Sequence, residues 1–174
     1  MTSTTVDSRT LLSISELRVA FDHRGHTSEV LHGVDLHIAR GESIGLVGES
    51  GCGKSVTWLA VLGLLGKHTR VTGSVKFQGR ELLGLSDTEL SQIRGRKIAM
   101  IFQDPSSALN PAQRVGAQIA ESLALHRGLR GAQANAEVLA LLDQVEIPDA
   151  KRRMNAYPHE LSGGMNQRVM IAIV

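Results

Sequence analysis

The sequence predicts an α/β fold that carries an antiparallel β subdomain and an α-helical subdomain. Alternating apolar residues, typical of strands, occupy the early part of the chain, and apolar residues at helical spacing occupy the late part. Between them, a short apolar run leads through a glycine-rich turn into a helical segment, as in the core of an α/β protein. We expect a disordered lead-in over residues 1–10, an antiparallel β and core region over about 11–104, and a helical subdomain over about 105–174.

Five segments are predicted to be strands. Residues 11–21, 31–41 and 71–79 alternate between apolar and polar side chains, as half-buried strands do. Residues 43–48 ("SIGLVG") and 96–102 ("RKIAMIF") contain short apolar runs next to turn residues, which is typical of strands buried on both faces. The last two segments would therefore belong to the core of the fold.

Helices are predicted after the glycine-rich turn, over residues 55–65, and throughout the last part of the chain. A short helix is expected from Asp87, and the last helix is expected to start at Gly163 or Gly164, because Ser162 is a good N-cap. The apolar faces of the late helices are formed by Val115, Ile119, Leu123, Val138, Leu141, Leu142 and Val145.

The composition fits a soluble globular domain, since 42% of the 174 residues are hydrophobic and 21% are charged. Nucleic-acid binding is not expected, because only 3% of the residues are aromatic and no basic cluster accompanies them. The single cysteine, Cys52, excludes an internal disulfide framework. The polar N-terminus does not resemble a signal peptide, and the longest apolar stretch, "WLAVLGLLG", is too short to span a bilayer.

The stretch "GESGCGKS", from Gly48 to Ser55, fits the pattern G-x-x-x-x-G-K-S of a phosphate-binding P-loop. A polyphosphate wrapped in backbone N–H groups leaves no room for a Cβ atom at the closest approaches, so glycine is required there. Lys54 would bring a positive charge to the β- and γ-phosphates, and the Ser55 hydroxyl would bind Mg²⁺. The predicted nucleotide contacts are Gly48, Glu49, Ser50, Gly51, Cys52, Gly53, Lys54, Ser55 and Val56.

Three further features narrow the class of nucleotide-binding protein. The stretch "LSGGMNQRVMIA", residues 161–172, resembles the signature motif of ATP-binding-cassette (ABC) ATPases. The stretch "MIFQDPSSALNP", residues 100–111, looks like their Q-loop, with Gln103 directly after a predicted strand. Phe21 ends the first predicted strand, where this family places an aromatic residue that stacks on adenine. With the P-loop, these motifs follow the order of the family, and the resemblance covers residues 11–174.

The resemblance implies ATP and Mg²⁺ as ligands and a head-to-tail dimer of two ATPase subunits. In such a dimer, residues 162–164 of one subunit contact the γ-phosphate of the ATP held by the P-loop of the other. Gln103 would reach Mg²⁺ and the attacking water, so Gln103 and Lys54 are the expected catalytic residues, and Ser55 and Gln103 the expected metal ligands. Taken alone, Ser-Gly-Gly would more often be a simple helix cap.

The sequences of these motifs are similar to those of the dipeptide and oligopeptide importer ATPases. This group also contains nickel importers and some glycoside importers. This implies a second ATPase subunit, identical or different, two membrane permease subunits, and a periplasmic or extracellular solute-binding protein that acts indirectly. The subunit would lie at the cytoplasmic side of the membrane as a peripheral protein. The surface near residues 108–118 would receive a short helix from a permease subunit.

Residues 1–174 lack the elements that this family places after the signature helix, a strand that ends in Asp-Glu and a later histidine. The Asp completes the Mg²⁺ environment and the Glu polarises the attacking water. Because Val174 also lies inside a predicted apolar helix, we expect a truncated core that does not hydrolyse ATP alone, within an intact protein that does.

The sequence also allows functions other than that of a peptide importer ATPase. A nucleotide-binding module without hydrolysis fits the missing carboxylates, and a nickel importer fits the same motifs. A soluble P-loop kinase would not explain the signature motif. An ABC protein of DNA repair or translation would not need a Q-loop sequence of the importer type. For His159 a structural or surface role is expected, and Asp104 is expected to be a loop carboxylate. The early histidines show no metal-ligand spacing: His23, His26, His32 and His37.

Overall fold

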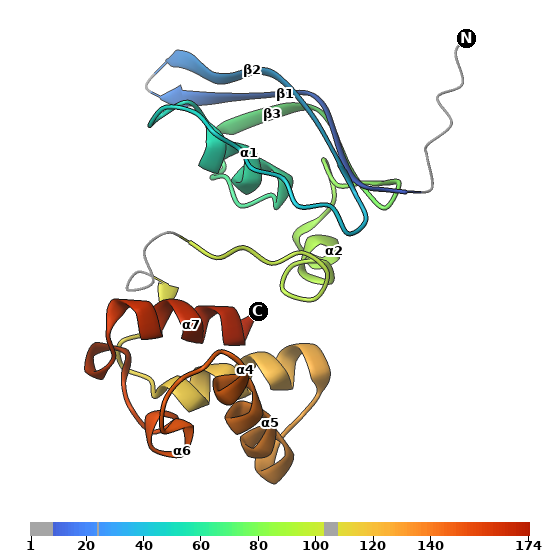
Figure 1. The fold of residues 1–174 in the computed structure, drawn as a ribbon. Coiled ribbons are helices and arrows are strands. Elements are labelled where there is room, and N and C mark those ends of the chain that lie inside the picture. The colour runs from blue at the N-terminus through green and yellow to red at the C-terminus, as the bar shows by residue number, and fades with distance from the viewer. Residues whose placement is uncertain (1–8, 24, 103–107) are drawn as a thin grey trace. The chain divides into compact units, whose positions relative to one another are not determined.

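The computed structural model describes residues 9–23, 25–102 and 108–174, and the expected lead-in therefore lies almost entirely outside the described residues (Figure 1). The chain divides into two compact units, residues 1–91 and residues 92–174. Each unit has its own apolar core and is described by itself.

The first unit is built on a four-stranded sheet whose order is β2–β1–β3–β4 and whose neighbouring strands are all antiparallel. The helix α1 lies along one face of this sheet (Figure 1). The antiparallel strands that the sequence predicts from alternation are confirmed. The elements of this unit are β1 (Thr10–His23), β2 (His26–Ala39), α1 (Lys54–Val61), β3 (Thr69–Phe77), β4 (Arg80–Glu81) and α2 (Asp87–Ser91).

A bulge in β1 keeps its apolar residues on one face of the sheet. The buried residues change from even to odd positions along the strand: Leu12, Ile14, Leu17 and Val19. The change occurs at Glu16, whose φ is 48° and where the pairing of β1 with both neighbours shifts register. An extra residue of this kind bends the strand and restores the inward face. Opposite the bulge, a Cβ atom at Gly73 would lie 2.8 Å from the Ser15 carbonyl oxygen, so the close approach requires glycine.

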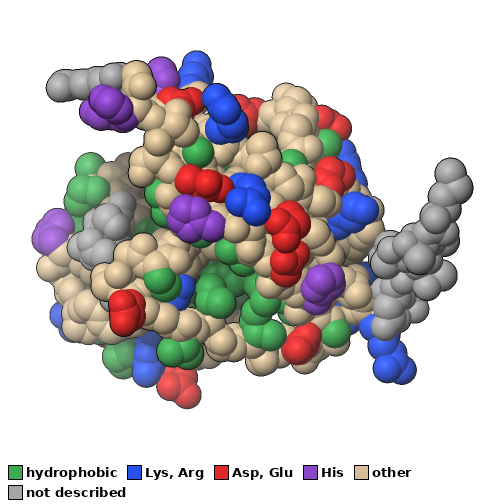
Figure 2. Space-filling model, turned by 90° about the horizontal axis from the view of Figure 1, so that it is seen from above, with side chains coloured by type: hydrophobic (Ala, Val, Ile, Leu, Met, Phe, Trp, Pro, Cys, Tyr) green, Lys and Arg blue, Asp and Glu red, His purple; other side chains and the backbone are tan. Residues whose placement is uncertain are grey.

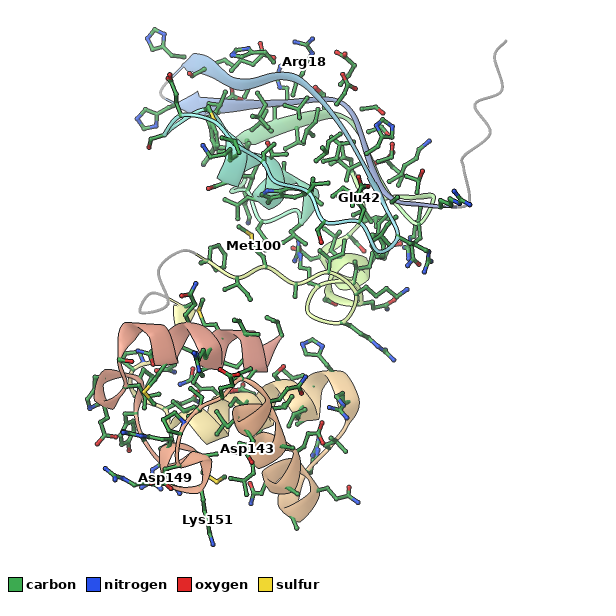
Figure 3. The ribbon with its side chains drawn as sticks, in the orientation of Figure 1. Arg18, Glu42, Met100, Asp143, Asp149 and Lys151 are labelled. Atoms are coloured by element: carbon green, nitrogen blue, oxygen red, sulfur yellow. The ribbon has the colours of Figure 1, made fainter. Side chains whose placement is uncertain are left out.

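The opposite face of the sheet is charged. Arg18 lies on the side away from α1 (Figure 3) and forms ion pairs of 3.3 Å with both Glu16 and Glu29. Acidic, basic and histidine side chains intermingle on the face of the molecule seen in Figure 2. The sheet therefore has one face in the core and one face in water, which explains why period-two alternation is visible in the sequence.

Glu81 fixes the hairpin between β3 and β4 with a carboxylate that accepts three hydrogen bonds. One oxygen accepts the Val75 amide at 2.8 Å and the Leu83 amide at 3.1 Å, and the other accepts the Ser74 hydroxyl at 2.5 Å. Partial burial acts to raise the pKa of Glu81, but the hydrogen bonds to Ser74, Val75 and Leu83 together outweigh it and lower the pKa.

We expect Glu81→Gln to lower the free energy of unfolding by about 1–2 kcal/mol, because a partly buried network loses the charge-assisted hydrogen bonds of its carboxylate. Since folding lowers the pKa of Glu81, its stabilisation is present at neutral pH and is lost as the pH falls through the lowered value. Urea unfolding at several pH values measures both effects. Glu121→Gln, at an exposed position of the second unit, is the matched control; equal losses in the two variants would contradict the role of Glu81.

The second unit is a bundle of helices packed around an apolar core (Figure 1). The faces predicted from helical spacing are confirmed, since Val115, Ile119 and Val138 are fully buried, and Leu141 and Val145 pack against the same core. The elements of this unit are α4 (Val115–Arg127), α5 (Gly131–Gln144), α6 (Ala150–Arg153), the 3-10 helix η1 (Pro158–Glu160) and α7 (Gly163–Ile173).

The sequence predicts two core strands, over residues 43–48 and 96–102, and this prediction is wrong for the structure. Neither segment is a strand, and Val47 is 96% exposed and Phe102 is 42% exposed. A strand needs a neighbour to satisfy its backbone N–H and C=O groups. Within the described residues, the segments have no ladder partner, apart from one isolated bridge between Arg94 and Ile98. Their apolar character alone therefore does not make them strands.

Candidate functional site

The glycine-rich loop of the first unit has the backbone that a phosphate-binding loop needs. Helix α1 begins at Lys54, directly after Gly53, whose φ is 94°, and Gly51 also has a positive φ of 83°. A Cβ atom at Gly53 would overlap with the side chain of Leu31, a buried residue of β2. Both the backbone angle and the space therefore require glycine at position 53. The first N–H groups of α1 are thereby presented at the end of the loop.

The Lys54 side chain folds back over the loop that precedes it. Its ammonium group donates hydrogen bonds to the carbonyl oxygens of Gly48, at 2.6 Å, and Glu49, at 2.7 Å, and lies 3.3 Å from the Cys52 sulfur. A Cβ atom at Gly48 would lie 2.8 Å from that sulfur, so the loop closes tightly around the ammonium group. The positive charge is thus held at the loop, where an anion bound by the loop N–H groups would meet it.

The first turn of α1 carries the remaining predicted contacts of the loop. Ser55 is exposed and Val56 is half-buried, so the Ser55 hydroxyl is accessible to a metal ion. Thr57, which the sequence did not single out, is buried and donates from both its amide (2.9 Å) and its hydroxyl (3.1 Å) to the Gly53 carbonyl oxygen. These two hydrogen bonds to one carbonyl oxygen fix the junction between loop and helix. The four-residue spacing from Gly53 is the signal that could have pointed to it.

The other exposed loop residues are accessible from solvent: Glu49, Ser50, Gly51 and Cys52. Phe21 lies in β1 of the same unit, half-buried, opposite Ser28 of β2 and Thr69 of β3. Gln103 and Asp104, by contrast, lie outside the described residues.

The Ser-Gly-Gly sequence of the second unit forms an exposed helix start. Ser162 is the N-cap of α7, and its hydroxyl accepts a hydrogen bond of 3.3 Å from the Met165 amide. Gly163 and Gly164 are exposed, and a Cβ atom at either position would meet nothing within 4 Å. The structure therefore leaves open space beside both glycines at this helix start, and a helix N-terminus favours an anion.

The histidine before the signature sequence lies at the surface. His159 is exposed and stacks on Tyr157, with ring centroids 5.6 Å apart and planes inclined by 11°, and the Arg114 guanidinium lies 6.0 Å from the Tyr157 ring. Among the described residues, no three His, Cys, Asp or Glu side chains gather as a metal site. None of the helices in the described part of the chain has the length and apolar character needed to cross a membrane.

Comparison with protein families and curated proteins gives consistent matches. The family model described as "ABC transporter" matches residues 31–174. The oligopeptide transport ATP-binding protein OppD of Salmonella typhimurium is 47% identical over 163 residues, which are 94% of this chain and 49% of the relative. The probable peptide ABC transporter ATP-binding protein y4tR of Sinorhizobium fredii is 48% identical over 165 residues, with 94% and 49% covered. The chain spans about half the length of these curated relatives.

Solved structures confirm the predicted fold class. The dimeric structure of MJ0796, a bacterial ABC transporter cassette, superposes with a TM-score of 0.79 at 27% identity and covers 93% of this chain and 68% of that chain. A dimeric post-hydrolysis state of the same cassette, bound to ADP and Pi, gives the same values. The α/β fold with an antiparallel β subdomain and a helical subdomain is therefore the fold of an ATP-binding cassette.

Proposed function

Because this chain belongs to the ABC transporter family, whose model matches residues 31–174, we propose that it is part of the ATP-binding subunit of an importer. The subunit couples the binding and hydrolysis of ATP to the uptake of peptides or similar small solutes through partner membrane subunits. Relatives named for oligopeptide, peptide and glutathione import support this solute class.

The conformation of the loop from Gly48 to Ser55 is the observation that carries the proposal. Glycine is required by a positive φ at Gly53 and by the Leu31 side chain beside it, and the Lys54 ammonium group is held at the loop. These features fit a nucleoside triphosphate, because backbone N–H groups and one lysine together neutralise a polyphosphate. The exposed Ser55 hydroxyl is a hard oxygen donor and fits Mg²⁺.

The chain's own residues then have separate tasks. Lys54 exchanges its two loop carbonyls for oxygens of the β- and γ-phosphates, and the glycines let the backbone approach the phosphates. Ser55 and Gln103 would hold Mg²⁺, and the ion would neutralise charge on the phosphates. Gln103 also orients the attacking water, and Phe21 stacks on the adenine.

The exposed helix start at Ser162, Gly163 and Gly164 serves a different nucleotide molecule. We propose that it binds the γ-phosphate of the ATP held by the P-loop of a second ATPase subunit, arranged head to tail. Two observations support this role: the open space around both glycines and the N–H groups presented at the start of α7. The dimeric solved structure of a related cassette is consistent with the arrangement.

We further propose that the subunit lies at the cytoplasmic side of the membrane, bound to two permease subunits through the surface near residues 108–118. A solute-binding protein on the other side of the membrane would deliver the solute. Residues 1–174 hold the nucleotide motifs but not the Asp-Glu pair that completes catalysis in the family, so this polypeptide by itself is not expected to hydrolyse ATP.

Reconstitution of the full-length subunit with its permease and solute-binding partners in liposomes tests the function. We expect uptake of a labelled oligopeptide that requires Mg·ATP on the side of the ATPase subunits, and phosphate release that rises when the peptide is present. Unlabelled peptide should compete for uptake, whereas nickel should not. Uptake of nickel with no response to peptide would contradict the proposed solute class, and uptake independent of ATP would contradict the function.

In a parallel assay, the polypeptide of residues 1–174 should release phosphate at the rate of buffer alone, because electrostatic stabilisation and positioning carry most of phosphoryl-transfer catalysis. The full-length subunit is the control. Sustained hydrolysis by the short polypeptide, lost on Lys54→Ala, would show that the Asp-Glu pair is not needed.

A further inference from the structure

Asn166 is a buried polar residue at the start of α7 for which the motifs assign no task. The residue is only 8% exposed, and its Nδ2 atom donates a hydrogen bond of 2.9 Å to the Pro158 carbonyl oxygen. The reversed amide would set Oδ1 against that carbonyl oxygen, so the donor must face Pro158. The Oδ1 atom has no hydrogen-bond partner in the structure. A buried amide with one unsatisfied atom costs stability, so the bond to Pro158 is the interaction that fixes this side chain.

The bond from Asn166 to Pro158 closes a loop that contains Ser162 and both glycines. Pro158 belongs to the 3-10 helix η1, and its carbonyl oxygen also accepts the Leu161 amide at 3.2 Å. The backbone N–H group of Asn166 donates a second hydrogen bond, of 2.9 Å, to the Ser162 carbonyl oxygen. One side chain thus ties the turn before the Ser-Gly-Gly sequence to the helix after it.

Side-chain packing adds little restraint to the exposed part of this loop. Apart from their chain neighbours and the backbone of α7 itself, no atom lies within 4 Å of a Cβ atom placed on Gly163 or Gly164. Leu161 and Met165 pack against the apolar core of the unit, but apolar packing is not directional. The directional restraints are the Ser162 cap, two backbone hydrogen bonds (Leu161 to Pro158 and Asn166 to Ser162) and the Asn166 side-chain tether. The tether is the side-chain bond among them that joins η1 to α7.

We propose that Asn166 is a positioning residue that sets the direction in which the Ser-Gly-Gly loop presents its N–H groups to the γ-phosphate held by the partner subunit. This inference rests on the proposed function, since it assumes the loop acts on a second nucleotide site. Asn166 does not touch the nucleotide. It acts through the Pro158 carbonyl oxygen, and the hydrogen-bond donor rather than the shape of the side chain is what matters.

Asn166→Asp tests the donor in the full-length subunit, because it replaces Nδ2 by an oxygen of nearly the same size. At pH 8 we expect kcat for ATP hydrolysis to fall about tenfold, since a carboxylate facing a carbonyl oxygen breaks the tether. ATP-dependent dimerisation should weaken in parallel, while the affinity of the chain's own P-loop for Mg·ATP stays within about twofold of wild type. Asn135→Asp, the same exchange at an exposed position of α5, is the matched control and should behave as wild type.

The pH dependence separates positioning from mere packing. Burial raises the pKa of a carboxyl group, and the protonated acid can donate to the Pro158 carbonyl oxygen again. The activity of Asn166→Asp relative to wild type should therefore recover as the pH is lowered toward about 6. Asn166→Ala, which offers no donor, should stay low at every pH. Loss in both variants with flat relative pH profiles, or wild-type kcat in both, would overturn the proposal.

Two further outcomes are distinguishable. If Asn166→Asp does not fold at pH 8, as shown by its thermal melt, Asn166→Ala decides: a lowered kcat with unchanged nucleotide affinity supports the tether, and a normal kcat overturns it. Gly163→Asp is measured beside these variants. If Gly163→Asp keeps its ATPase activity, the proposed action of the Ser-Gly-Gly loop on the partner's γ-phosphate fails. If Gly163→Asp loses activity and the Asn166 variants do not, only the role of Asn166 fails.

Discussion

Lys54→Ala should weaken the binding of Mg·ATP to the full-length subunit by about ten- to a hundred-fold. The substitution removes a charge-assisted contact to the phosphates, which contributes roughly 1.5–3 kcal/mol. The structure makes the loss specific, because the Lys54 ammonium group is fixed at the loop by the carbonyl oxygens of Gly48 and Glu49. The same two bonds close the loop, so the variant also loses part of its loop order. Equilibrium dialysis with labelled nucleotide measures the effect.

Lys67→Ala is the matched control, since Lys67 is an exposed lysine of the same unit that follows α1. It should bind Mg·ATP as wild type does. An unchanged dissociation constant for Lys54→Ala would contradict the assignment of the P-loop. An equal loss in both variants would show that net charge, and not the position of Lys54, determines the affinity.

Gly163→Asp should abolish ATP hydrolysis and transport while the subunit still binds Mg·ATP. The new carboxylate would lie where the γ-phosphate of the partner's nucleotide binds, and repulsion between two anions would prevent the dimer from closing. The fold should tolerate the change. Gly163 has open space around it, and an acidic residue in the first turn of α7 is favourable to the helix. The loss should therefore appear in kcat and not in the thermal melt.

Gly163→Ala is the matched control for this variant, because it adds a Cβ atom in open space without a charge. It should keep more activity than Gly163→Asp. If Gly163→Asp hydrolyses ATP at the wild-type rate, the Ser-Gly-Gly loop does not act on a phosphate.

The elements that face water on one side could be predicted from the sequence, because their burial leaves a period in the residue pattern. The alternation in β1, β2 and β3 and the helical spacing of Val115, Ile119 and Leu123 are of this kind. The P-loop can also be proposed from the sequence, since its glycines and Lys54 are close together there.

Features that depend on residues far apart, or on a neighbouring strand, could not be predicted. The apolar run over residues 43–48 predicts a strand, yet a strand forms only with a hydrogen-bonding neighbour, and in the described residues this run has no ladder partner. The Leu31 side chain lies beside Gly53, which is 22 positions later in the sequence. The Asn166 side chain donates a hydrogen bond to the Pro158 carbonyl oxygen. No local sequence pattern predicts either contact.

We propose that this chain carries two phosphate-binding loops that serve different nucleotide molecules. Equilibrium dialysis of Mg·ATP against the wild type, Lys54→Ala and Gly163→Asp, each at a dilution that keeps the subunit monomeric, tests the two loops most directly. We expect that Lys54→Ala alone loses affinity and that Gly163→Asp binds as tightly as the wild type. A loss in Gly163→Asp equal to that in Lys54→Ala, in a protein that melts normally, would contradict it.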